Sequence, residues 1–171
     1  MKVTLSVIKA DIGSIGGHMA PSRHLLDIVK GEVAQLACDL DLVIDHCVSF
    51  TGDGIAFLLT HTRGIGDPAV HGLAWDAFAA GTREAQAEGL YGAGQDLPKD
   101  AFSGNVKASG PAAAEMENEE RDNEPLLMFA ADKTDPGAFN LPLYLAFADP
   151  MNTPGLILSP KLARGFRFVV I

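Results

Sequence analysis

The chain has 171 residues, which is enough for one domain with a substantial core, so we expect a single domain over residues 1–171. Its formal net charge of −9 argues against a nucleic-acid-binding protein, because contacts to phosphates require a surplus of Lys and Arg. No apolar run approaches the roughly 18 residues that span a bilayer, and the N-terminus alternates like a strand rather than a leader peptide. We therefore expect a cytoplasmic protein without membrane contact.

Residues 2–9 alternate between apolar and polar side chains, which predicts a β-strand, and a Gly-rich loop follows at residues 11–17. Apolar residues then recur at helical spacing, so we expect an amphipathic helix over residues 22–38 that packs on a sheet. The two cysteines, Cys38 and Cys47, lack the paired spacing of a zinc site, and we expect buried, reduced thiols.

Two β-rich runs, residues 42–50 and 55–61, are joined by Thr51-Gly52-Asp53-Gly54, whose composition is typical of a hairpin turn. We expect His46 and His61 to lie across this hairpin from each other and to be structural.

The dipeptide Asp67-Pro68 predicts the start of a second helix, with Asp as the N-cap and Pro at the first helical position, and this helix is expected to end near Gly89. The order strand, helix, hairpin, helix, strand predicts a layered α/β fold. Residues 91–111 form a long polar loop, which is typical of functional or disordered regions. The acidic run at residues 115–121 is expected to be solvated, and two further strands are expected at residues 125–131 and 167–171.

Carboxylates recur where predicted strands end or turn, at Asp11, Asp53 and Asp132, and Gln95-Asp96 lies in the long loop. Several carboxylates aimed at one point repel each other unless a cation neutralises them, and such oxygens are the ligands that Mg²⁺ accepts. Lys133, next to Asp132, would supply a positive charge for a phosphate. The pattern indicates metal-assisted phosphoryl chemistry, although a single Asp in a turn is more often a local side-chain cap than a ligand.

Longer motifs run through the chain in the order SVIKADIGSIGGH (6–18), THTRG (60–64), LYGAGQDL (90–97), AFSGNV (101–106), GPAAAEMENEER (110–121), FAADKTDPGAFNLPLYLAFADPMNTPGLILSP (129–160) and GFRF (165–168). Together they resemble the bifunctional fructose-1,6-bisphosphate aldolase/phosphatase family over essentially the whole chain.

The resemblance implies a Mg²⁺-dependent enzyme of gluconeogenesis that condenses dihydroxyacetone phosphate with glyceraldehyde 3-phosphate. The product, fructose 1,6-bisphosphate, would then lose its 1-phosphate. The resemblance also implies a layered α-β-β-α sandwich, of which this chain would form a part, and assembly into a homo-octamer.

Carried over position by position, the resemblance implies one Mg²⁺ held by Asp11, His18, Asp53 and Gln95, and a second ion to which Asp53 and Asp132 contribute. It further implies contacts to sugar phosphate from a set of five residues, namely His18, Tyr91, Gly104, Asn105 and Lys133.

Two departures from the family pattern matter. Family members carry a second Asp directly after Asp53, where this chain has Gly54, so we expect a weaker second metal site. Family members are also considerably longer, and their Schiff-base lysine and its tyrosine partner lie in the part without a counterpart here, so we expect no aldolase activity from this chain alone. Two alternatives stay open: a degenerate homologue that binds metal and sugar phosphate without turnover, and a metal-dependent phosphatase for other small phosphomonoesters.

Overall fold

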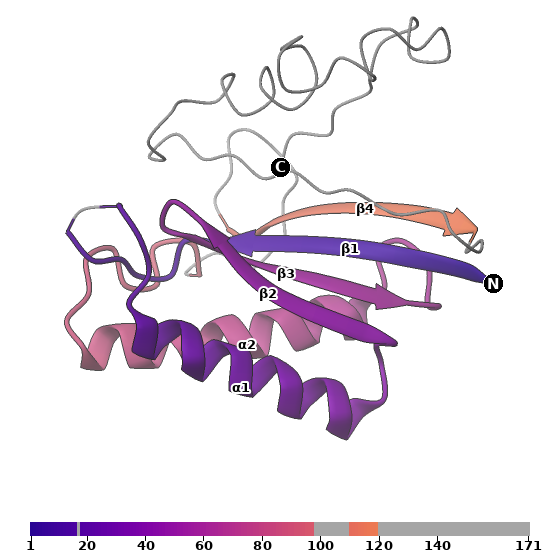
Figure 1. Ribbon diagram of the computed structural model, residues 1–171, viewed down its shortest axis with the longest axis horizontal. Helices are drawn as coiled ribbons and strands as arrows, with labels where there is room; N and C mark the ends of the chain where they lie inside the picture. The colour runs from indigo at the N-terminus through magenta and orange to yellow at the C-terminus, as the bar shows by residue number, and fades with distance from the viewer. Residues whose placement is uncertain (17, 98–109, 120–171) are drawn as a thin grey trace, which may run out of the picture.

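In the part of the chain that the structure describes, a four-stranded antiparallel sheet carries two helices on one face (Figure 1). The computed structural model describes residues 1–16, 18–97 and 110–119. Within them the elements follow the order β1 (Lys2–Ala10), α1 (Arg23–Leu40), β2 (Asp45–Thr51), β3 (Gly54–His61), α2 (Pro68–Ala87) and β4 (Ala112–Glu119). This arrangement confirms the expected α/β class and is consistent with part of a layered sandwich.

The strand order β2-β3-β1-β4 places β1 between β3 and β4. In the antiparallel pairing of β1 with β3, Lys9 lies opposite Ala56 and Ala10 opposite Ile55. The last residue of β1 therefore lies beside the beginning of β3. As a consequence, the Gly-rich loop after β1 and the turn between β2 and β3 emerge at the same edge of the sheet.

Each helix begins at a capping residue, and the sequence predicts the second of these caps, Asp67. The Oγ of Ser22 accepts a hydrogen bond from the backbone N–H of Leu25 (2.9 Å), which satisfies one of the free donors at the start of α1. At the start of α2, Asp67 Oδ1 accepts from the N–H groups of Ala69 (3.0 Å) and Val70 (3.1 Å), and Pro68 occupies the first turn. Local capping thus fixes where each helix starts.

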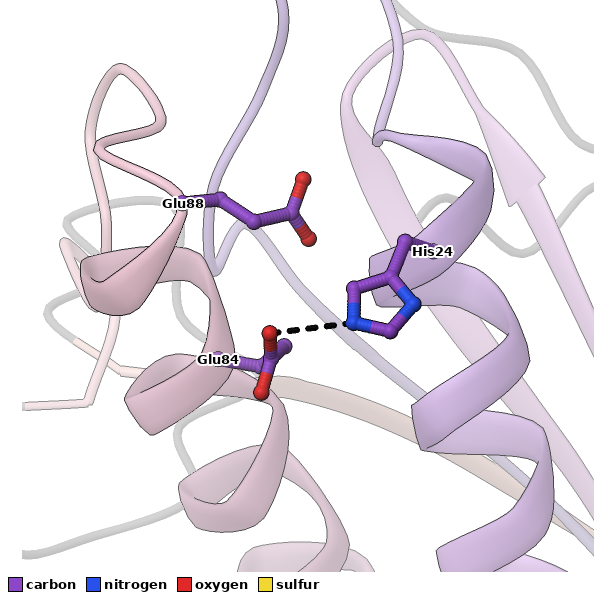
Figure 2. A group of neighbouring side chains, drawn as sticks. All are labelled: His24, Glu84 and Glu88. Atoms are coloured by element: carbon purple, nitrogen blue, oxygen red, sulfur yellow. Dashed lines mark hydrogen bonds and ion pairs between the residues drawn. The ribbon is translucent and has the colours of Figure 1, made fainter.

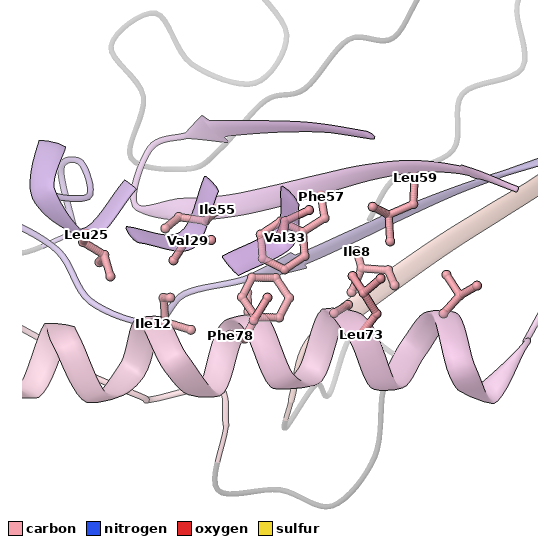
Figure 3. Close-up of a cluster of buried hydrophobic side chains, with 14 of the residues drawn as sticks. Ile8, Ile12, Leu25, Val29, Val33, Ile55, Phe57, Leu59, Leu73 and Phe78 are labelled. Atoms are coloured by element: carbon pink, nitrogen blue, oxygen red, sulfur yellow. The ribbon is translucent and has the colours of Figure 1, made fainter. Parts of the chain in front are cut away.

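The hydrophobic core lies between the sheet and the helices, and Figure 3 shows its side chains pointing toward one another. The rings of Phe57 on β3 and Phe78 on α2 stack with centroids 4.0 Å apart and planes at 14°. Gly81 lets the helices approach closely, because a Cβ there would lie 2.5 Å from Val29 Cγ2 on α1. The fully buried residues around these pairs include Ile8, Ile12, Leu25, Val33, Ile55, Leu59, Val70 and Ala77.

The acidic run at residues 115–121 is solvated as expected over residues 116–119, which are exposed, but Glu115 is partly buried. Residues 112–119 form β4, which pairs with β1 in antiparallel register, with Ser6 opposite Glu115. Glu115 turns toward the helices and is held by hydrogen bonds from Ser6, Gly66 and His71. The other acidic side chains of β4 are exposed. Distant partners, which local charge density does not reveal, stabilise the strand.

Two smaller expectations are wrong. Cys38 and Cys47 are free but exposed: the first lies on the outer side of α1, and the second lies on β2, at one edge of the sheet that the described residues form. His46 lies opposite Leu59 rather than His61, and His61 is fully buried against β1. His61 therefore has the structural role that the sequence predicts, but it contacts β1 rather than His46.

The strands expected at residues 125–131 and 167–171 lie outside the described residues, as does most of the long loop. Neither helix in the described part of the chain is both long and apolar enough to cross a membrane.

Candidate metal and phosphate site

The loop that follows β1 is fixed by the segment that follows α2. The backbone N–H of Asp11 donates to Asp96 Oδ2 (2.8 Å), and Gln95 Nε2 donates to Asp11 Oδ2 (3.4 Å). Ser14 and Tyr91 exchange two backbone hydrogen bonds, at 2.9 and 3.0 Å. Hydrogen bonds thereby join segments about 80 residues apart into one pair of loops, and the Asp11 and Gln95 side chains meet.

Glycine shapes the turn that carries Gln95. Gly92 has a φ of +64°, in the left-handed region, and a Cβ at this position would lie 2.7 Å from Gln95 Oε1. The same point is 3.9 Å from Cε1 of His18. The missing side chain therefore leaves the Gln95 amide close to His18.

His18 is held in a specific orientation. Its backbone has a φ of +67°, an uncommon conformation for a residue with a side chain, and its N–H donates to Ser14 Oγ at 3.0 Å. The imidazole ring packs edge to face on Tyr91, with centroids 4.8 Å apart and planes at 86°. Its Nδ1 forms a hydrogen bond with Asp53 Oδ2. This bond leaves Nε2 as the ring nitrogen available to a ligand.

Asp53 lies in the hairpin turn and is only 2% exposed. One carboxylate oxygen binds His18, whereas Oδ1 is buried and has no hydrogen-bond partner in the part of the chain that the structure describes. A buried acceptor without a partner costs about 1–3 kcal/mol, and more when it is charged. Such an atom is a natural ligand for a cation.

Four of the five residues expected to bind metal lie in neighbouring loops at this edge of the sheet: Asp11, His18, Asp53 and Gln95. Asp11 also reaches the hairpin turn, since its Oδ1 lies 2.7 Å from the position that a Cβ of Gly54 would take. Carboxylate and amide oxygens are the donors that Mg²⁺ prefers. The donor set and the unpartnered Asp53 oxygen therefore fit this ion, and the assignment of ligands stays a prediction.

Of the residues expected to contact sugar phosphate, His18 and Tyr91 lie together at this edge. Gly104, Asn105, Asp132 and Lys133 lie outside the described residues. The sequence alone did not indicate Ser14, which holds both His18 and Tyr91, because a serine in a Gly-rich loop carries no distinctive signal.

A second polar cluster, around Glu115, is structural. The N–H of Arg63 donates to His61 Nδ1 (3.3 Å), so His61 Nε2 carries the proton and donates to Ser6 Oγ (2.8 Å). The Ser6 hydroxyl in turn donates to Glu115 Oε1 (2.7 Å), which also accepts from His71 Nε2 (3.0 Å). Each group is satisfied, and the network joins β1, β3, β4 and α2.

The environment of this cluster shifts two pKa values. Burial lowers the pKa of His61 below 6.5 and outweighs the attraction of Glu115, which would raise it. Burial on its own would raise the pKa of Glu115, but the hydrogen bonds from Ser6, His71 and Gly66 outweigh it and lower this pKa. The cluster thus favours a neutral His61 and an ionised Glu115.

A third group consists of His24, Glu84 and Glu88 and joins the first turn of α1 to the end of α2, as Figure 2 shows. His24 Nε2 lies 3.1 Å from Glu84 Oε1, and Ser22 Oγ donates to Glu88 Oε1 at 3.0 Å. The His24 side chain is 60% exposed. Because the three side chains contact one another or Ser22 and lie at the surface, we interpret the group as a surface contact between the helices.

Comparison with known proteins gives a consistent result. Residues 2–171 match the family model described as fructose-1,6-bisphosphatase. The chain is 59% identical, over its whole length, to the fructose-1,6-bisphosphate aldolase/phosphatase of Thermus thermophilus, and covers 47% of that protein. It is 54% identical to the protein of the same name from Cenarchaeum symbiosum, with 96% of this chain and 43% of the relative aligned. The chain thus spans less than half the length of these curated relatives.

Proposed function

Since the chain belongs to the fructose-1,6-bisphosphatase family, we propose that it forms the N-terminal, metal- and substrate-binding part of a Mg²⁺-dependent fructose-1,6-bisphosphate aldolase/phosphatase. The observation that carries the proposal is the buried, unpartnered Oδ1 of Asp53, which lies where the loops bearing Asp11, His18 and Gln95 meet. The relatives' names supply the substrate, fructose 1,6-bisphosphate.

Asp11, His18, Asp53 and Gln95 would hold the ion, and Asp132 would add a further carboxylate. When bound, Mg²⁺ supplies positive charge that neutralises phosphate oxygens and favours attack on phosphorus. The chain's own residues hold the geometry. Asp53 orients the imidazole through Nδ1, and Asp96 fixes the backbone of Asp11.

Tyr91 lies beside His18 with its side chain exposed, and we propose that it contacts the sugar phosphate together with Gly104, Asn105 and Lys133. Fructose 1,6-bisphosphate, and the triose phosphates that form it, would bind on this edge. We do not propose aldol condensation by this chain alone, because the resemblance implies that the family's Schiff-base lysine lies outside the part of the family that this chain matches.

One observation favours a second function, namely binding of metal and sugar phosphate without turnover. Hydrolysis of phosphate esters often relies on two ions that stabilise both the attacking and the leaving oxygen. Gly54 supplies no carboxylate beside Asp53, and the space of a side chain at this position is filled by Lys9. A weak second site would leave binding intact and reduce hydrolysis.

The test is Mg²⁺-dependent release of phosphate from fructose 1,6-bisphosphate by the purified chain. Asp53→Asn serves as the control for a contaminating phosphatase, and Gly54→Asp tests the missing carboxylate. Release by the wild type that Asp53→Asn abolishes and Gly54→Asp accelerates supports the enzyme. Thermal stabilisation by Mg²⁺ and fructose 1,6-bisphosphate without release supports the binding protein. If neither stabilisation nor release occurs, the proposed site is wrong.

A further inference from the structure

The head of a lysine side chain lies beside the carboxylates, in the space that a side chain at residue 54 would occupy. Lys9 is the next-to-last residue of β1 and pairs with Ala56 of β3. Gly54 lies two residues before Ala56 and so points to the same face of the sheet. Lys9 and residue 54 are therefore diagonal neighbours across the strand pair, within reach of a long side chain.

A side chain at residue 54 and the head of Lys9 compete for the same space. A Cβ on Gly54 would lie 2.6 Å from Lys9 Nζ and closer still to Lys9 Cε, so the two side chains cannot occupy this position together. The φ of Gly54 lies outside the left-handed region, and its backbone would accept any residue. Glycine matters at this position because it leaves room for Lys9.

The ammonium group lies among the acidic residues of the site. Lys9 Nζ and Asp11 Oδ1 are both within 2.7 Å of the same point, and Asp53 is the residue next to Gly54 in the hairpin turn. A positive charge in a half-buried site neutralises nearby carboxylates and repels a divalent ion that approaches the same oxygens. These two effects act together against binding of the ion.

We propose that Lys9, admitted by Gly54, is a built-in cation that competes with a divalent ion for the carboxylates of Asp11 and Asp53 and thereby sets the metal affinity of the site. The inference rests on the proposed function and deepens it, since it names the pair of residues that controls how tightly the ion is held. Removal of the Lys9 ammonium group should therefore strengthen binding of the divalent ion, whereas loss of a carboxylate ligand should weaken it.

The experiment measures the affinity of the full chain for Mn²⁺, a hard divalent ion with the ligand preferences of Mg²⁺, by electron paramagnetic resonance of the free ion. Lys9→Met removes the charge and keeps a long apolar stem. Gly54→Ala adds the Cβ that displaces the lysine head. Lys30→Met is the matched control, because Lys30 is exposed on α1. Circular dichroism verifies that each variant is folded.

We expect Lys9→Met and Gly54→Ala each to bind Mn²⁺ about tenfold more tightly than the wild type, which corresponds to about 1.4 kcal/mol. The double variant should bind like Lys9→Met, because both changes remove the same charge from the same place. Lys30→Met should bind like the wild type.

Three other results would contradict the proposal in different ways. Unchanged or weaker binding by Lys9→Met, with measurable binding by the wild type, refutes the role of Lys9 and leaves the proposed function standing. Tighter binding by Lys9→Met with wild-type binding by Gly54→Ala refutes the coupling between the two positions. Absence of Mn²⁺ binding in the wild type and all variants overturns both the inference and the proposed metal site.

Discussion

Replacement of Asp53 by Asn should stabilise the chain without metal and remove its stabilisation by metal. Asp53 is 2% exposed and its Oδ1 has no partner among the described residues, an arrangement that costs about 1–3 kcal/mol. Asn keeps the acceptor for His18 and removes the buried charge. It also removes the attraction to Lys9 and leaves its amide group without a partner, so the gain should be near the lower limit, about 1 kcal/mol. For a chain of this length that raises Tm by about 2–4 °C.

The assay is thermal unfolding of both proteins, first with EDTA and then with excess Mg²⁺. A ligand present at a hundredfold its Kd stabilises a protein by about 2.7 kcal/mol, so Mg²⁺ should raise the Tm of the wild type above that of Asp53→Asn. The order of the two melting temperatures should therefore reverse between the two conditions.

The control is Asp27→Asn, since Asp27 is an exposed carboxylate on α1 and its replacement should change neither Tm nor the response to Mg²⁺. A wild type that is the more stable protein in EDTA would show that the Asp53 carboxylate is satisfied in the folded chain. An equal response of both proteins to Mg²⁺ would show that the ion binds elsewhere.

Other expected results concern the core and the Glu115 network. Gly81→Ala should destabilise the fold by about 1–3 kcal/mol through a clash with Val29. Gly72→Ala, whose Cβ would meet no described atom within 4 Å, should stabilise α2 by about 0.5–1 kcal/mol. Urea unfolding measures both free energies. Glu115→Ala should cost about 1–3 kcal/mol, because it leaves the partly buried donors of Ser6 and His71 unpaired, and a loss below about 1 kcal/mol would contradict the network. The pKa of His61 is lowered in the folded state, so as pH falls the unfolded chain takes up a proton at this residue before the folded chain does. The contribution of His61 to stability is therefore complete above pH 6.5 and is lost as pH falls through and below this value. The pKa of Glu115 is also lowered, so acid removes its contribution as well, below pH 4.5. In His61→Gln, the loss of stability near pH 6.5 should be absent from urea unfolding at several pH values. An unchanged pH dependence would refute the assignment of this loss to His61.

Local features of the sequence determine most of the secondary structure. The caps Ser22 and Asp67 accept hydrogen bonds from residues two or three positions along the chain, and the hairpin turn joins strands that pair directly. The helices and the first three strands follow from such short-range interactions and from the periodicity of apolar residues. For the same reason, Asp11, Asp53 and Gln95 could be identified as candidate ligands from their places at strand ends and in a loop.

Long-range contacts decide the rest. The strand β4 forms by pairing with β1, more than 100 residues earlier in the chain. Ser6, 109 residues before Glu115, and His71, 44 residues before it, satisfy a carboxylate on this strand that would otherwise favour water. The meeting of Asp11 with Gln95, and of Lys9 with the space beside Gly54, depends on the register of the sheet and on the packing of loops distant in sequence. The sequence by itself therefore determines the elements and the chemical groups available, because these depend on near neighbours. The tertiary structure alone decides which groups meet, since only packing brings distant residues within bonding distance.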